Sequence, residues 1–244
     1  MNPDQLEIVC WDEKWKDLLG RRDVSNFTDP DNIRYYRAFN GVVNKVTGPA
    51  YSACEFGCGS GTHLIYARDL FERLYFVDGS PNALLYAEFL LSMPGGSKKG
   101  SFIKDNVLDS KLESDLFYFT FNSGVIEHYS EEDIFRILQN MRRVSKPGGK
   151  VLVAWPNLLS IASVYLRLTG HSLTTERYYR PKKIRNITLE AGLSGIQSYN
   201  FPIVWPPGFS QNFYARTSGI ERMLANMGMG FLHILSAEKV GRTK

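Results

Sequence analysis

A glycine-rich segment carries the strongest chemical signal in this sequence. Gly57, Gly59 and Gly61 follow an apolar stretch that ends at Glu55, and a helix-like run, 63–71, comes directly after them. Glycine adopts positive φ without steric cost and lets a ligand approach the backbone closely, and a helix N-terminus offers free N–H groups. The pattern therefore predicts a strand, a turn and a helix that together bind a bulky, polar, nucleoside-like ligand.

An acid ends the second predicted strand. The β-prone run 73–77 stops at Asp78 and Gly79. In a doubly wound sheet a ligand lies across the carboxyl ends of neighbouring strands, and an acid about 20 residues after the glycine turn suits the hydroxyls of a ribose. Asp before Gly also forms ordinary turns. Beside this glycine segment we expect Asp78 to bind ribose.

A histidine follows the fourth predicted strand, 116–121. The residues after that strand include Glu127, His128 and Tyr129. An unperturbed imidazole titrates near pH ~6.5, so His128 is the best candidate for a base that accepts a proton from a reacting group. Tyr129 and Glu127 are weaker candidates. The alternative is that His128 packs against or caps the following helix, and the sequence leaves both open.

The elements that must position these residues form an α/β pattern. Strand-like and helix-like runs alternate along the chain, as in a doubly wound, mainly parallel sheet. The run 116–121 is continuously apolar, which is typical of a strand covered on both faces. Apolar residues between 134 and 141 recur at helical spacing, and a tight turn at 146–150 precedes another apolar run at 151–155.

The glycine segment resembles the first motif of the class I S-adenosylmethionine-dependent methyltransferases, E/D-x-G-x-G-x-G, which residues 55–61 match at every specified position. The Glu127-His128 pair and the Lys-Pro-Gly-Gly turn resemble later signatures of the same family. Within the family the chain is most similar to small-molecule, ubiquinone/menaquinone-type methyltransferase domains. A dinucleotide fingerprint would need a third glycine at position 62, where Thr62 stands.

This resemblance implies a Rossmann-like fold with a seven-stranded sheet, an antiparallel last strand, and S-adenosyl-L-methionine as the cofactor. It implies that Asp78 clamps both ribose hydroxyls and that Asp105 holds the adenine amino group. Tyr36 and Arg37 are candidates for contact with the cofactor's carboxylate or with the substrate, and a docked surface helix is the alternative. The cofactor-binding residues expected on this basis are Glu55, Gly57, Gly59, Gly61, Asp78, Gly79, Asp105, Asn106, Ser123 and Arg37.

The resemblance also argues against a metal. Ubiquinone-pathway O-methyltransferases carry E-x-x-E-H at the fourth strand, and this chain has Gly124 where the first glutamate would stand. Cys10, Cys54 and Cys58 lack the spacing of a zinc site. The paired prolines of DNA-amino methyltransferases are also missing, which argues against methylation of a flipped base by that mechanism. RNA and protein acceptors stay open.

The 244 residues are predicted to form one domain, 1–244. Residues 158–168 are apolar on most sides, so we expect them to be covered on both, by a pocket or by a partner subunit. A basic and aromatic segment, 177–185, either binds an acidic or aromatic substrate or starts a solvated helix. The predicted parts are a helical cap at 1–49, the cofactor-binding core at 50–155, a lid insertion at 156–183 and the rest of the core at 184–244.

Composition narrows the function only slightly. A net charge of +4 gives no strong nucleic-acid signal. No apolar run approaches the roughly 20 residues of a membrane span, and the first residues are not those of a signal peptide. These properties indicate a cytoplasmic protein, and the resemblance implies an enzyme that methylates a small molecule on oxygen, nitrogen or carbon. The alternatives are a methyltransferase for RNA or protein and a noncatalytic S-adenosylmethionine-binding protein, and a homodimer stays open.

Overall fold

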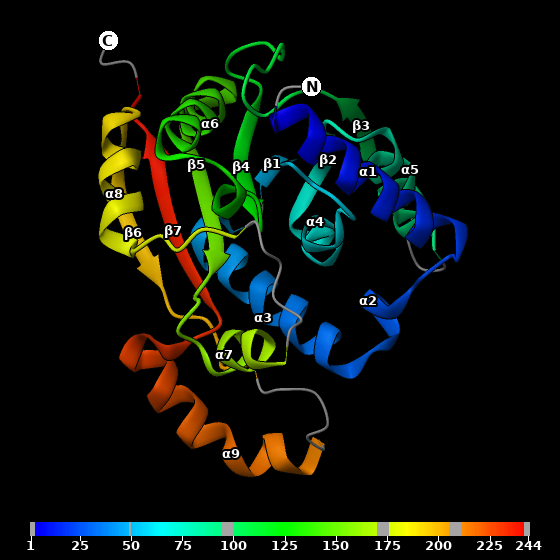
Figure 1. Cartoon of the computed structure of the whole chain (residues 1–244). Helices are drawn as coiled ribbons and strands as arrows, with labels where there is room; N and C mark the ends of the chain where they lie inside the picture. Colours follow the sequence, from blue (N-terminus) through cyan, green and yellow to red (C-terminus); the bar gives the residue numbers. More distant parts are fainter. Residues whose placement is uncertain (1–2, 49, 94–99, 170–175, 205–210, 242–244) are drawn as a thin grey trace.

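The computed structural model describes residues 3–48, 50–93, 100–169, 176–204 and 211–241. At its centre is a seven-stranded sheet with the order β3-β2-β1-β4-β5-β7-β6 (Figure 1), and β7 runs antiparallel to both of its neighbours. This confirms the predicted doubly wound, mainly parallel sheet with an antiparallel last strand. The strands are β1 (Ala50–Phe56), β2 (Phe71–Asp78), β3 (Gly100–Lys104), β4 (Phe117–Ser123), β5 (Ser145–Pro156), β6 (Leu193–Tyr199) and β7 (Leu232–Lys239).

Helices cover both faces of this sheet. None of those in the described segments combines the length and the apolar character that crossing a membrane requires. The helices are α1 (Pro3–Gly20), α2 (Ser25–Thr28), α3 (Pro30–Thr47), α4 (Thr62–Tyr66), α5 (Pro81–Leu91), α6 (Glu131–Val144), α7 (Ile161–Leu168), α8 (Pro181–Glu190) and α9 (Gln211–Leu224), with short helical turns η1 (Arg68–Leu70), η2 (Ile126–His128) and η3 (Ala225–Met229).

Strand β5 shows how the core is divided between the two faces. Leu152 and Ala154 pack in the apolar cluster with α3, α4 and α5. Val151, Val153 and Trp155 pack in the opposite cluster with α6 and α8. Successive side chains of a strand point to opposite faces, so a strand covered on both faces must be apolar throughout. The continuous apolar runs in the sequence have this cause.

The predicted turn at 146–150 lies inside β5 rather than before it. Phe117 of β4 already pairs with Ser145, and Phe119 pairs with Lys150. The residues between Ser145 and Lys150 therefore bulge out of a strand whose pairing starts earlier than predicted. The proline and glycines of this segment thus predict the irregularity correctly, but the strand begins before them, at Ser145.

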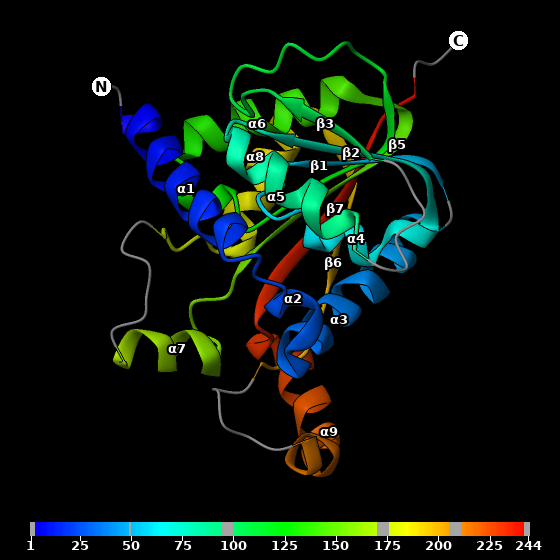
Figure 2. The ribbon, with the colours of Figure 1, turned by 90° about the vertical axis from the view of Figure 1, so that its right-hand side faces the viewer.

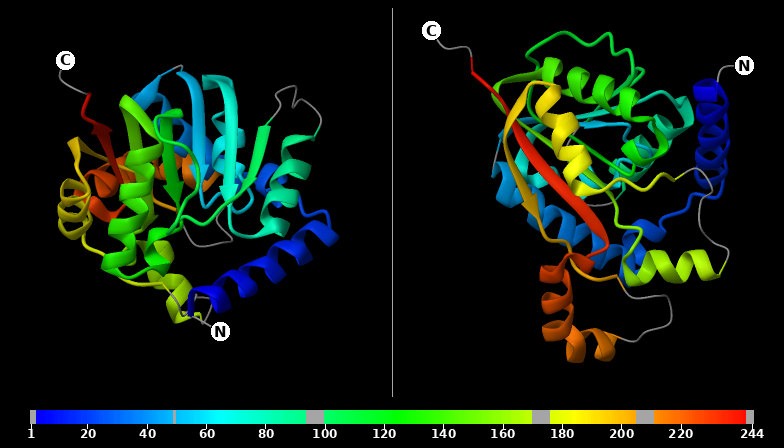
Figure 3. Two further views of the ribbon diagram at one scale, coloured as in Figure 1. Left: turned by 90° about the horizontal axis from the view of Figure 1, so that it is seen from above. Right: turned by 60° about the vertical axis from the view of Figure 1, so that its left-hand side comes forward.

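Three helices lie outside the central layers. Both views of Figure 3 place α1 and α7 on the side of the molecule that faces the viewer in Figure 1, and Figure 2 shows α9 extending away from the sheet. Val164 and Leu168 of α7 are exposed, Leu168 by 83%. Within the described chain the apolar segment 158–168 is thus covered on one side, and the cover expected on its other side, from a pocket or a partner subunit, stays a prediction. Residues 170–175 of the predicted lid lie outside the described residues.

Candidate functional site

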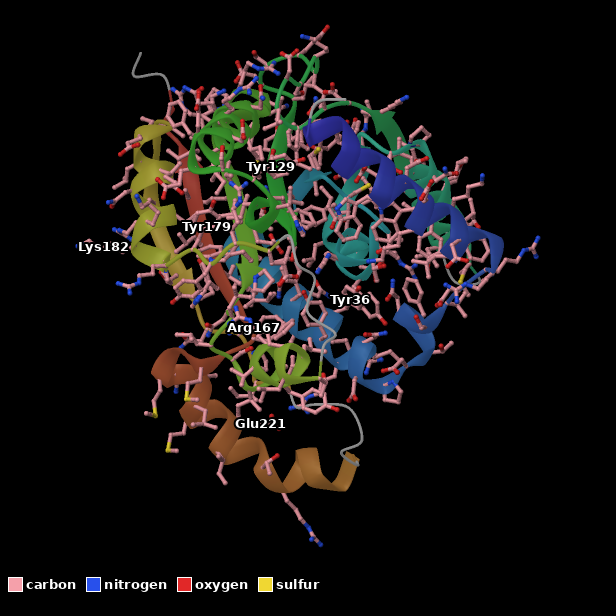
Figure 4. All side chains as sticks on the ribbon, viewed as in Figure 1. Tyr36, Tyr129, Arg167, Tyr179, Lys182 and Glu221 are labelled. Carbon is pink, nitrogen blue, oxygen red and sulfur yellow. The ribbon has the colours of Figure 1, made fainter. Side chains whose placement is uncertain are left out.

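A cavity of about 290 Å³ lies where β1, β2, β3 and β4 end. This volume is near the lower end of the range for small-molecule sites. Tyr36 of α3 also lines the cavity, and Figure 4 shows Tyr36 and Tyr129 on this side of the molecule. The predicted site residues that line the cavity are Gly57, Gly59, Asp78, Gly79, Asn106 and Ser123, together with His128 and Tyr129.

The glycines of the first motif have different roles. Gly59 has a φ of +50° and lines the cavity, and a Cβ atom there would lie 2.8 Å from Cζ2 of Trp15. Gly61 has a φ of +65° and is not among the lining residues. A Cβ atom at Gly61 would lie 2.7 Å from Cδ1 of Phe76 and 3.1 Å from Cβ of Ala87. The third glycine therefore serves the packing of α4 against β2 and α5.

Replacing Gly61 with alanine is expected to lower the free energy of unfolding by about 2–4 kcal/mol. A left-handed backbone with a Cβ atom costs about 1–2 kcal/mol, and overpacking adds about 1–3 kcal/mol. Urea unfolding measures the change. Gly41→Ala is the matched control, because nothing lies within 4 Å of a Cβ atom at that position. Equal stability of the two variants would refute the packing role.

Asp78 brings a carboxylate to the cavity wall. Its Oδ2 accepts a hydrogen bond from the N–H of Gly59 at 2.8 Å, and its Oδ1 accepts one from the N–H of Ser80 at 2.8 Å. Burial raises the pKa of this carboxyl, and the two N–H donors oppose that rise. A carboxylate has about four lone-pair sites, so Asp78 can also accept hydrogen bonds from two hydroxyls. The arrangement fits the ribose of a nucleoside.

Asp105 does not line the cavity, contrary to the role that the family resemblance implied. Its carboxylate accepts hydrogen bonds from the N–H of Asn106 at 2.9 Å, from Oγ of Ser110 at 2.6 Å and from the N–H of Lys111 at 3.1 Å. Asp favours such local turns, because its short side chain reaches neighbouring N–H groups. Asn106 and Val107 form this part of the wall instead.

Glu55 also lies behind the cavity rather than at it. Its side chain is buried, accepts a hydrogen bond from the N–H of Leu64 at 3.2 Å, and lies 3.3 Å from Nδ1 of His63. Burial raises the pKa of Glu55, and His63 opposes the rise. His63 does line the cavity, and its Nε2 lies 3.2 Å from the hydroxyl of Tyr35. Glu55 thus orients a histidine that our sequence reasoning missed.

Arg37 is exposed and is not among the residues that line the cavity. Its neighbour on α3, Tyr36, the other candidate from the sequence, does line the cavity. Consecutive residues of an α-helix point about 100° apart, since 3.6 residues make one turn. The sequence placed the right helix at the site, but the cation expected for the cofactor's carboxylate faces away.

Helix α1 runs along the cavity and contributes Trp11, Lys14 and Trp15 to its wall. Asp12 anchors the helix, because Oδ1 of Asp12 accepts a hydrogen bond from Oγ of Ser80 at 2.6 Å. The same carboxylate accepts hydrogen bonds from the backbone and side chain of Asn82, at the start of α5. Helical spacing of the tryptophans indicated the cap, whereas nothing in the sequence singled out Lys14 or Asp12.

His128 and Glu127 are adjacent but have different surroundings. Burial and the nearby Lys14 lower the pKa of His128 to about 4, so its imidazole is neutral at pH 7. Burial raises the pKa of Glu127 to about 8, and its Oε2 has no hydrogen-bond partner among the described residues. In the described segments, no group of three or more His, Cys, Asp or Glu side chains could hold a metal ion.

Comparisons with known proteins agree with this geometry. Residues 53–149 match the family model of a methyltransferase domain. No curated protein matches the chain. Three of the most similar solved structures follow.

A magnesium protoporphyrin IX methyltransferase from Synechocystis PCC 6803, solved with S-adenosylhomocysteine, has a TM-score of 0.61 and 17% identity, over 93% of this chain and 93% of that one. A geranyl diphosphate C-methyltransferase from Streptomyces coelicolor A3(2) has a TM-score of 0.60 and 15% identity, over 85% of this chain and 80% of that one. An S-adenosylmethionine-dependent methyltransferase from Thermotoga maritima has a TM-score of 0.60 and 14% identity, over 84% of this chain and 90% of that one.

At these identities the structural likeness establishes the fold, and the family match covers the segment that holds the glycine turn, Asp78 and His128. The cavity fits a nucleoside cofactor through its glycine turn and its ribose-type carboxylate. Residues 53–149 thus match a methyltransferase domain, and the chain has the fold of solved S-adenosylmethionine-dependent methyltransferases, with a cavity that fits a nucleoside cofactor.

Proposed function

We propose that this chain transfers a methyl group to a small-molecule acceptor, on an oxygen, nitrogen or carbon atom. The observation that carries the proposal is one cavity in which the glycine turn, Asp78 and His128 meet. Geranyl diphosphate and magnesium protoporphyrin IX, the molecules named for two of the structural neighbours, are small molecules. Their names support the acceptor class and leave the acceptor itself open.

S-adenosylmethionine, when bound, supplies a methyl group already activated on a positively charged sulfur. The residues of the chain have to align the acceptor and exclude water. Asp78 and the backbone of the glycine turn would hold the nucleoside. Trp11 and Trp15 cover the cavity with apolar surface. The imidazole of His128 is neutral at pH 7, lines the cavity and would accept the proton of an oxygen or nitrogen acceptor.

The ubiquinone/menaquinone-type assignment is a finer part of this proposal. It rests on the Glu127-His128 pair after β4. Gly124 replaces the first glutamate of the E-x-x-E-H motif, so Glu127 and His128 would act without that second carboxylate. Quinone precursors therefore belong among the first acceptors to be assayed.

Incubation with methyl-labelled S-adenosylmethionine tests the proposal. The purified protein is mixed with separate pools of small metabolites, RNA and protein from one cell extract. We expect label in the small-metabolite pool. Label in the RNA or protein pool would favour a macromolecule methyltransferase instead. A protein that binds S-adenosylhomocysteine but labels none of the pools would be a noncatalytic binder.

Replacing His128 with alanine is expected to lower kcat by about a hundredfold while changing cofactor affinity little. Positioned proton transfer contributes about 10²–10⁴ to a rate. Because the pKa of His128 is about 4, the rate of the unmodified enzyme should not fall between pH 7 and pH 5. Initial rates and cofactor titrations measure both effects. Full activity of His128→Ala would remove this residue from the mechanism.

A further inference from the structure

Lys14 places a positive charge at the cavity wall. Its Nζ lies 4.3 Å from the centre of the Trp11 ring and 5.3 Å from the centre of the Trp15 ring. Contacts with ring faces fix the position of an ammonium group and leave its N–H donors for an anion. Among the described residues, no carboxylate forms an ion pair with Lys14, whose side chain lines the cavity and is partly exposed to solvent.

Nearby acids have other hydrogen-bond partners than Lys14. The carboxylate of Asp78 is engaged by two backbone N–H groups, and that of Asp12 by the start of α5. Glu127, with a pKa raised by burial to about 8, is mostly protonated at neutral pH. The wall beside His128 therefore has a positive charge available, and the positively charged sulfur of a bound methyl donor would add to it.

A second basic segment borders the same wall. The N–H of Arg177 donates to the carbonyl oxygen of Glu127 at 2.8 Å, and the hydroxyl of Tyr179 donates to the carbonyl oxygen of Tyr129 at 2.7 Å. Figure 4 labels Tyr129 and Tyr179 in this part of the molecule. Arg177 and Arg180 are both exposed. Two exposed arginines therefore belong to the segment that contacts this wall, together with Glu176, which lies close enough to Glu127 to act on it electrostatically.

We propose that the methyl acceptor carries an anionic oxygen group, a carboxylate or a phosphate, and that Lys14 binds this group beside His128. The proposal rests on the proposed function and names its substrate class. Lys14 acts as a specificity residue. A bond between an ammonium and an anion selects against uncharged analogues, because these leave the ammonium unpaired.

Calorimetry on the protein saturated with S-adenosylhomocysteine tests this proposal. Inorganic pyrophosphate and benzoate are titrated separately at constant ionic strength, so that the two titrations distinguish phosphate from carboxylate. We expect the unmodified protein to bind one of them. Lys14→Met should weaken that binding at least about tenfold, and Lys14→Arg should retain most of it. Lys16→Met, at a lysine of the same helix that is not among the residues lining the cavity, should leave it unchanged.

Binding of S-adenosylhomocysteine is measured first for every variant. If it binds and neither anion does, the proposal is wrong while the proposed function stands. Equal anion affinity of Lys14→Met and the unmodified protein would also overturn it. If S-adenosylhomocysteine does not bind to the unmodified protein, the proposed function fails and this proposal fails with it.

Discussion

Replacing Asp78 with alanine is expected to weaken the binding of S-adenosylmethionine by at least about a hundredfold. The carboxylate lies at the cavity wall with two lone-pair sites already used by backbone N–H groups. Two hydroxyl donors would use the others, and each hydrogen bond to a charged group contributes about 1.5–3 kcal/mol. A tenfold change in affinity corresponds to about 1.4 kcal/mol. Titration calorimetry measures the loss.

Two further variants make this test specific. Asp78→Asn keeps the side-chain volume and one acceptor oxygen, so it separates the loss of charge from the loss of loop contacts. Asp109→Ala is the matched control, because Asp109 is exposed and forms its ion pair with Lys111, away from the cavity wall. Circular dichroism verifies the fold of each variant. Unchanged affinity in a folded Asp78→Ala protein would count against the ribose assignment.

Replacing Glu127 with glutamine is expected to abolish a large part of the pH dependence of stability. Burial raises the pKa of Glu127 from 4.5 to about 8 in the folded protein. The folded state therefore keeps a proton that the unfolded state releases, and its contribution to stability is complete below pH 4.5 and is lost as pH rises towards 8. The slope is about 1.4 kcal/mol per pH unit. The total reaches a few kcal/mol by pH 8.

Urea unfolding at pH 5, 6, 7 and 8 gives the slope for each protein. The difference between Glu127→Gln and the unmodified protein should grow in favour of the variant with increasing pH. A difference in stability that stays constant with pH is no evidence for the raised pKa of Glu127. The glutamine amide would also stand at a position without a hydrogen-bond partner, and that effect does not depend on pH. Glu132→Gln, at an exposed residue of α6, should show the same dependence of unfolding free energy on pH as the unmodified protein. Parallel curves for Glu127→Gln would show that Glu127 titrates normally.

Several strands and helices of the fold could be predicted from local sequence properties. A strand covered on both faces must be apolar throughout, and positive φ favours glycine, so β1, β4 and the glycine turn could be predicted directly. The same holds for α6, which begins after the capping residue Ser130. The turn predicted at 146–150 before β5 lies inside β5, because the positions of proline and glycine do not reveal which residues pair across strands.

The sequence by itself determined the fold class, the glycine turn and the acid at the end of β2, because each depends on residues close together in the chain. The tertiary structure decided which side chains meet in the cavity. Asn106 rather than Asp105 lines the wall, since Ser110 and Lys111 draw the carboxylate into a local turn. Lys14 lines the same cavity as His128 only through the docking of α1, which packing against α5 and the contacts of Asp12 determine. Such contacts join distant segments and leave no pattern at any fixed spacing.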